Sequence, residues 1–316
     1  MGVLLKLNVT MKELFQFSVF LGAAILTGCT SVSTTAQREH TIAPYRERKI
    51  GGVSLEKFLA DRTTQVFAGT ELIFESTASS PDSMTFHFHG KGAFTMGKAV
   101  AIDSRGYFLT AAHVVRHGPV TVFFGEGLTL KPFQARIVWC GDNEPTRPDL
   151  ALIHIDASVS TTFAWTQDSH VGDIVLAVGP NLASTQRTWK SCTKNFSDGL
   201  MAGKILAEPD SAKAQIQTNI LTDDLPLHPG DSGGPLTDDQ GRLVGINITV
   251  QYDYSRSKFG EPKKFTSHAI HPDPDLLQQL IEKDFSIHNL NSSLKADIKQ
   301  NSPTPNQTGA GEIGVR

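Results

Sequence analysis

The sequence predicts an all-β protein whose short strands form a sandwich or a pair of barrels. About a dozen short runs rich in β-branched and aromatic residues follow one another between residues 63 and 270. Each run is bounded by Gly, Pro, Asp or Ser, which favour turns. No helical periodicity separates the runs, which argues against alternating strands and helices.

The expected strands share a length of five to nine residues and an apolar character. In chain order they cover residues 64–69, 71–76, 84–89, 98–103, 107–112, 120–124, 134–140, 150–155, 173–179, 215–220, 242–250 and 265–270. A helix is expected over 272–283, where a proline-bearing acidic start precedes apolar positions at helical spacing. Residues 287–316 are rich in Asn, Ser, Pro, Thr and Gly and are expected to form a disordered tail.

The N-terminus has the pattern of an export signal. Residues 13–28 are mostly apolar, follow Lys12 and end in small residues, which predicts a signal peptide over 1–28. Residues 26–29 read Leu-Thr-Gly-Cys and resemble the lipobox of bacterial lipoproteins, in which Cys29 receives the lipid. The alternative is an ordinary signal peptide with an incidental cysteine. Residues 29–62 are expected to tether the domain to a membrane of the cell envelope, and Thr30 after the cysteine favours the outer membrane.

Charge and cysteine content exclude some other classes. The formal net charge of −3 leaves no basic patch of the kind that nucleic-acid binding needs. No CxxC pair or His/Cys cluster indicates a metal, and no cofactor is expected. Cys140 and Cys192 either form a disulfide after export or remain two separate buried thiols; the sequence leaves both open.

Three segments carry residues suited to acyl transfer. They are the strand that runs into His113, the aspartate that opens an apolar strand at Asp149, and the glycine-rich turn Pro-Gly-Asp-Ser-Gly-Gly-Pro around Ser232. Taken singly, the histidine and the aspartate have structural explanations. A serine nucleophile, however, needs an imidazole to take its proton and a carboxylate to orient that imidazole. Glycines around it allow backbone N–H groups to converge on an oxyanion.

In the order His, Asp, Ser, the segments GYFLTAAHVV, PDLALIHI and PGDSGGPL resemble the three catalytic motifs of chymotrypsin-like (trypsin-like) serine proteases. The stretch after the serine and the final helix resemble the HtrA-like branch, here without a PDZ domain. The resemblance implies two packed antiparallel six-stranded β-barrels with a C-terminal helix over about residues 63–286. It also implies endopeptidase activity on polypeptides, with Gly230 and Ser232 supplying the oxyanion-hole N–H groups.

The specificity pocket departs from the trypsin pattern. Pro226 occupies the position six residues before the nucleophile, where the base of the primary pocket is expected, so cleavage after Arg or Lys is not supported. Ile248 and Val250 are expected to narrow the pocket, which favours a small or medium apolar P1 residue. With a different loop length, Asp223 or Asp224 would enter the pocket and restore a basic preference.

Two further questions stay open at this level. Asp231 precedes the nucleophile, and residues 48–53 resemble an activation site, so that a cut after Lys49 would create an Ile50 N-terminus to pair with Asp231. Otherwise this stretch is simply a basic tether and Asp231 bonds to local backbone. The alternative to an active protease is a non-cleaving, chaperone-like protein that binds peptides on the same fold. The oligomeric state is not indicated.

Overall fold

The computed structural model describes residues 42–70, 72–80, 83–90, 94–124, 131–141, 148–178, 200–207, 220–227, 230–253 and 264–301. The chain divides into two compact units. The first ends at Asp273 and holds all the strands of the described residues, and the second begins at Pro274 with helix α4 (Pro274–Asn301). Within the described part of the chain, no helix has the length and apolar character that a membrane span requires.

The first barrel is a closed antiparallel sheet of six strands. Their order around the barrel is β10-β7-β6-β3-β8-β9. Their bounds are β3 (Thr63–Gly69), β6 (Phe94–Asp103), β7 (Tyr107–Thr110), β8 (Val120–Phe124), β9 (Lys131–Cys140) and β10 (Ala151–His154). The short turn η1 (Ala112–Val114) follows β7.

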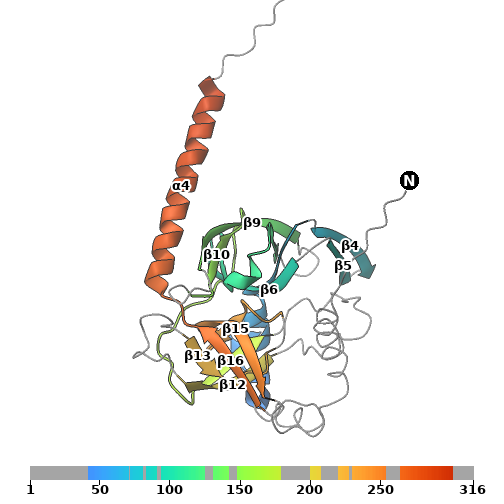
Figure 1. The fold of residues 1–316 in the computed structure, drawn as a ribbon, viewed down its shortest axis with the longest axis vertical. Helices are drawn as coiled ribbons and strands as arrows, with labels where there is room; N and C mark the ends of the chain where they lie inside the picture. The colour runs from blue at the N-terminus through green and yellow to red at the C-terminus, as the bar shows by residue number, and fades with distance from the viewer. Residues whose placement is uncertain are drawn as a thin grey trace, which may run out of the picture. The chain divides into compact units, whose positions relative to one another are not determined.

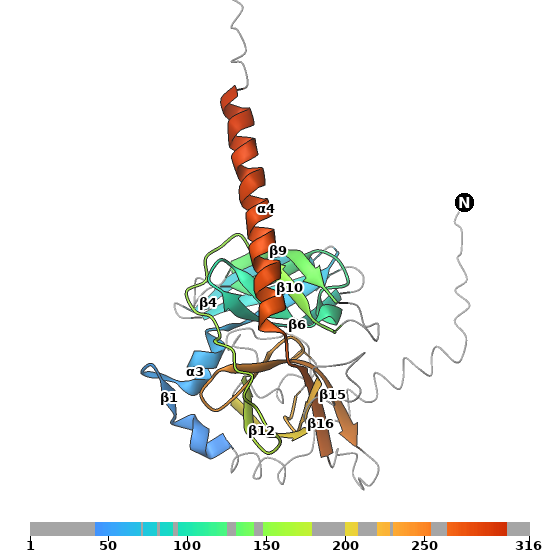
Figure 2. The same ribbon diagram turned by 90° about the vertical axis from the view of Figure 1, so that its left-hand side faces the viewer.

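The second barrel is also closed, antiparallel and six-stranded. Its order is β11-β12-β13-β16-β15-β14. The bounds are β11 (Ile174–Val178), β12 (Leu200–Ala207), β13 (Ile220–Asp223), β14 (Pro235–Thr237), β15 (Leu243–Asp253) and β16 (Lys264–Ile270). Figures 1 and 2 show β6, β9 and β10 grouped on one side, and β12, β15 and β16 on the other. The predicted fold of two six-stranded barrels with a C-terminal helix is therefore confirmed. The prediction of disorder from residue 287 is wrong up to residue 301, because α4 continues to Asn301.

Some strands differ from the sequence-based expectation. β4 (Leu72–Ser80) and β5 (Ser83–Gly90) were expected among the sheet strands, but they pair only with each other in a separate ribbon. Conversely, β12 and β14 were not anticipated. Gly203 interrupts the apolar pattern of β12. Glycine is needed there because a Cβ would lie only 2.9 Å from the Leu225 nitrogen. At three residues, β14 is too short to show a period. Of the expected strand 215–220, only residue 220 lies within the described residues.

Part of the expected tether is folded. Residues 49–60 form β1 (Lys49–Ile50), β2 (Val53–Ser54) and α3 (Leu55–Ala60), and Leu55 and Leu59 are fully buried. Ser54 caps α3 by accepting the Lys57 N–H at 3.3 Å. These contacts follow from the apolar spacing of α3, which needs a surface to pack against. The predicted signal peptide, Cys29 and Cys192 lie outside the described residues.

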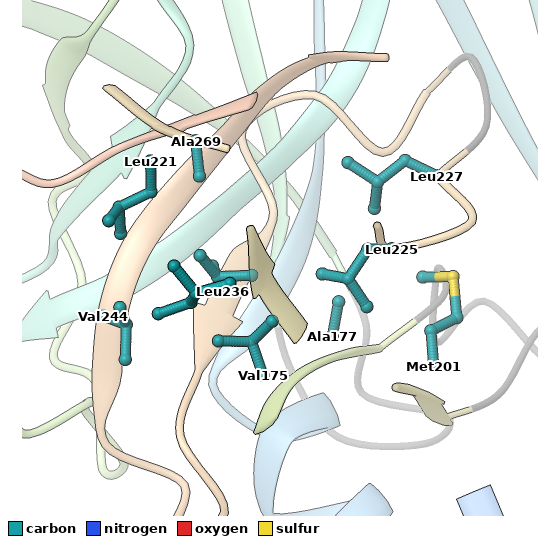
Figure 3. Packing of buried hydrophobic residues seen from close by; sticks show 10 residues of the cluster. Val175, Ala177, Met201, Leu221, Leu225, Leu227, Leu236, Val244 and Ala269 are labelled. Atoms are coloured by element: carbon teal, nitrogen blue, oxygen red, sulfur yellow. The ribbon is translucent and has the colours of Figure 1, made fainter. Parts of the chain in front are cut away.

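The core of the second barrel gathers side chains from the barrel strands and from the segment after β13. Figure 3 shows Leu225 and Leu227 pointing into this core beside Ala177 and Met201. The whole cluster consists of Val175, Ala177, Met201, Ile205, Leu221, Leu225, Leu227, Leu236, Val244 and Ala269. Burial of Leu225 and Leu227 fixes the path of the chain directly after β13.

Candidate active site

His113 lies in η1, directly after β7 of the first barrel. Its Nδ1 is 2.7 Å from Oδ2 of Asp149, and its backbone N–H donates to Asp149 Oδ1 at 2.8 Å. Two bonds to one carboxylate fix the ring as well as the backbone of the histidine. Because Nδ1 points at the carboxylate, it carries a proton, and Nε2 is left as the basic nitrogen.

Asp149 precedes β10, and the register of β10 with β7 brings it to His113. Ala151 pairs with Thr110 in this register, so the chain segments before β10 and after β7 meet at the same end of the barrel. Burial by itself raises the pKa of the Asp149 carboxyl, but the hydrogen bonds and the charge of His113 outweigh this effect. The pKa of Asp149 therefore lies below its usual value, and the group is an anion at neutral pH.

Ser232 lies in the tight turn that leads into β14 of the second barrel. Gly230 and Gly233 adopt φ values of 100° and 84°, a region that favours glycine. The Gly233 N–H donates to the Asn247 carbonyl at 2.7 Å, which ties the turn to β15. The Ser232 hydroxyl donates to the carbonyl of Ile248 at 3.2 Å.

The serine turn is pressed against β6 of the first barrel. The Lys98 N–H donates to the Ser232 carbonyl at 2.7 Å. A Cβ on Gly97 would lie 2.6 Å from the same carbonyl and 2.5 Å from Val114 Cγ2. Val114, the residue after His113, and the carbonyl of Ser232 therefore both lie next to Gly97. Local sequence patterns do not single out Gly97 or Lys98, since neither residue belongs to a catalytic motif.

The structure thus brings His113 and Asp149 into direct contact, and the Ser232 carbonyl and Val114, the residue after His113, both lie next to Gly97. The hydroxyl of Ser232 bonds to Ile248 and not to the imidazole. Within the described residues, the N–H groups of Gly230 and Ser232 are not donors in the backbone bonds that hold the turn.

The residues expected in the specificity pocket lie in the second barrel. Pro226 is buried, Ile248 is 9% exposed, and Val250 packs against the core cluster. Asp223 is fully buried at the end of β13, and its Oδ2 atom has no hydrogen-bond partner among the described residues. Asp224 is exposed and accepts the Lys204 N–H at 2.6 Å.

The segment that carries these residues is similar to a known protein family. Residues 97–246, which include His113, Asp149 and Ser232, match the trypsin-like peptidase domain. The likeness covers the site itself, from the β6 strand under the serine turn to the β15 strand beside it.

Known proteins with similar sequences include bacterial serine endoproteases, one of which is named as periplasmic. The serine endoprotease DegS of Escherichia coli is 30% identical over 56% of this chain and 45% of its own length. The periplasmic serine endoprotease DegP of Escherichia coli is 27% identical over 70% of this chain and 48% of its own length. The chain therefore spans about half the length of the curated relatives that it matches.

Solved structures with a similar fold include the serine endoprotease of Yersinia pestis. It is 22% identical, with a TM-score of 0.45, and the match covers 72% of this chain and 64% of that one. A second is an HtrA-type protease, AlgW, with a decapeptide. It is also 22% identical, with a TM-score of 0.48, and the match covers 72% of this chain and 66% of the other.

Proposed function

We propose that the protein is an exported serine endopeptidase that hydrolyses polypeptides with Ser232, His113 and Asp149 as its catalytic triad. The observation that carries the proposal is the pair of hydrogen bonds by which Asp149 holds both the ring and the backbone of His113. A purely structural histidine would not need its Nδ1 fixed in this way next to a glycine-rich serine turn. The match of residues 97–246 to the peptidase domain supports the same function.

The proposed reaction proceeds through an acyl-enzyme. Ser232 Oγ attacks the carbonyl carbon of the peptide bond while its proton passes to His113 Nε2. The N–H groups of Gly230 and Ser232 bind the oxyanion, and the Asp149 anion stabilises the imidazolium that forms. His113 then gives its proton to the leaving amine as the C–N bond breaks. Water, activated by the same imidazole, hydrolyses the ester and restores Ser232.

Before attack, the Ser232 hydroxyl has to turn from the Ile248 carbonyl to His113. At 3.2 Å its bond to Ile248 is long for an O–H···O hydrogen bond, and such a bond contributes little net free energy. Rotation about one side-chain torsion is fast compared with turnover. A substrate strand that lies beside β15 also competes for the Ile248 carbonyl, which would release the hydroxyl.

For specificity, we propose a pocket lined by Pro226, Ile248 and Val250 that accepts a small or medium apolar P1 residue. Pro226 and Ile248 are buried, and neither offers a charge to an Arg or Lys side chain. The buried Asp223 is the residue that would support the alternative, a basic P1 residue. A profile of cleaved peptides distinguishes the two.

We also propose that Cys29 carries a lipid that anchors the enzyme in the cell envelope, facing the periplasm. The lipobox-like sequence supports the anchor, and the periplasmic serine endoprotease DegP among the relatives supports the compartment. Cys29→Ser should move the protein from the detergent phase to the aqueous phase in a partitioning experiment. Equal aqueous partitioning of both forms would contradict lipid attachment.

The triad is tested by labelling with a fluorophosphonate, which forms a covalent bond only with an activated serine. The wild-type chain should incorporate about one label per molecule, and Ser232→Ala none. Ser232→Ala and His113→Ala should each lower kcat for casein hydrolysis about a million-fold while leaving the fold intact. A stable wild-type protein that is neither labelled nor proteolytic would instead support a non-cleaving, peptide-binding protein.

A further inference from the structure

Lys98 is a lysine in the interior of the protein. It belongs to β6 and is 1% exposed, although lysine is almost never fully buried unless it is paired. Its Nζ atom lies 2.7 Å from Asp231 Oδ1 and donates to the Val178 carbonyl at 2.5 Å. Asp231 itself is 5% exposed. A buried ion pair persists only when its charges are matched and hydrogen-bonded, as they are here.

The ion pair joins the two barrels at the nucleophile. Lys98 belongs to the first barrel, whereas Val178 and Asp231 belong to the second. The backbone of Lys98 also takes part, because its N–H donates to the Ser232 carbonyl at 2.7 Å. The side chain and the backbone of Lys98 therefore hold two consecutive residues, Asp231 and Ser232.

The same region leaves no room for the turn to shift toward β6. A Cβ on Gly233 would lie 2.0 Å from the Lys98 carbonyl, and one on Gly234 would lie 2.9 Å from Lys98 Cδ. The glycines permit this close approach of the turn to the lysine. On the other side, the Gly233 N–H is tied to Asn247 of β15. The turn is thus clamped between β6 and β15.

We propose that Lys98 is a positioning residue that holds the serine turn in its working shape through the ion pair with Asp231. The proposal rests on the proposed protease function. It assigns to a side chain within the folded domain the cationic role that a new Ile50 N-terminus would otherwise fill. Ile50 is engaged elsewhere, since it pairs with Val53 and its side chain lies beside Gly241. The enzyme is therefore competent without a cut after Lys49.

Loss of the Lys98 ammonium should lower the catalytic rate as well as the stability of the protein. Without the Lys98 ammonium, the buried Asp231 carboxylate loses the cation that stabilises it. Turning toward water then lowers its free energy, because water hydrates the charge. That movement carries the N–H groups of Gly230 and Ser232 away from the oxyanion position. Loss of one such donor typically lowers kcat by about 100- to 1,000-fold.

The test compares Lys98→Met with the double variant Lys98→Met/Asp231→Asn in the full chain. The probes are the second-order rate of fluorophosphonate labelling, the rate of fluorescein-casein hydrolysis, and Tm. We expect Lys98→Met to lose at least about 100-fold in both rates and to have a lower Tm. The double variant leaves no unpaired charge, so its Tm should recover while both rates stay at least about 30-fold below wild type.

A role in stability alone predicts a different pattern. If both rates recover together with Tm in the double variant, or if folded Lys98→Met has wild-type rates, the proposal is overturned. Val122→Ala serves as the control for lost stability, because Val122 is fully buried in β8 of the first barrel and has no part in the serine turn. It should lower Tm and leave both rates within about threefold of wild type. If the wild-type chain itself shows no labelling and no hydrolysis, the protease function fails, and this inference fails with it.

Discussion

Asp149 beside the first barrel is partly buried and Asp223 in the second barrel is fully buried, and their surroundings move their pKa values in opposite directions. Burial raises the pKa of each. At Asp149 the two hydrogen bonds from His113 and its charge outweigh burial, and the pKa is lowered. At Asp223 burial dominates, the Leu225 N–H opposes it only in part, and the pKa rises to about 7.

The difference shows what a buried carboxylate needs in order to remain an anion. Asp149 has a donor on each oxygen, whereas one oxygen of Asp223 has no partner among the described residues. The neighbouring charge of Asp224 adds to the cost of ionising Asp223. An anion can therefore serve catalysis at Asp149, while Asp223 exchanges a proton near neutral pH.

The sharpest test of the Asp149 environment is Asp149→Asn. The amide can no longer hold the histidine in its working tautomer or stabilise an imidazolium, so kcat should fall about ten-thousand-fold. The measurement is the rate of casein hydrolysis at pH 8, with Ser232→Ala as the inactive reference that gives the background rate. Activity within tenfold of wild type would mean that the two hydrogen bonds to His113 are structural.

A second test asks whether the Asp223 region takes part in substrate binding. A peptide-library profile should show Ala, Val, Thr or Leu at P1. Lys and Arg should be disfavoured about tenfold to a few hundredfold, because the proposed pocket wall is apolar. A dominant Lys or Arg preference would place the charge of Asp223 in the pocket, and Asp223→Asn should then abolish that preference.

The raised pKa of Asp223 also predicts a pH-dependent stability. The unfolded group titrates near 3.8 and the folded one near 7, so the native state binds more protons between these values. Stability from this group is therefore lost as the pH rises from about 4 to 7, by up to roughly 4 kcal/mol. Asp223→Asn should raise Tm at pH 8 and change it little at pH 4.

Ile220→Val is the matched control for this experiment, since Ile220 lies in the same strand, β13, and carries no titratable group. Its Tm difference from wild type should stay nearly constant between pH 4 and 8. If the difference for Asp223→Asn is equally flat across this range, the carboxyl of Asp223 is not the group that titrates.

The smallest effect is expected at the segment that resembles an activation site. Lys49→Gln in the full chain should leave kcat and KM unchanged, because Asp231 already has Lys98 as its cation. The measurement is casein hydrolysis by the uncleaved chain beside a chain that begins at Ile50. Higher activity in the trimmed chain would show that the serine turn needs a new N-terminus after all.

Local patterns in the sequence were sufficient for the fold class and for the candidate triad. Alternating apolar runs between turn residues indicate strands because side chains alternate across a sheet, and most barrel strands were found in this way. The Gly-Asp-Ser-Gly-Gly turn was recognisable because a nucleophile needs glycine on both sides. The same rule found β4 and β5 as strands but not that they pair only with each other, because periodicity does not say which strands pair. It also missed β12 and β14.

Only the tertiary structure decided the partners of the buried charges. Lys98 opens the expected strand 98–103, and nothing in its neighbours marks it as buried or relates it to Asp231 in the other barrel. Likewise, adjacent aspartates at 223 and 224 look alike in sequence, but one is fully buried and the other exposed. The physical reason is that burial and ion pairing depend on how distant strands pack, which no local pattern encodes.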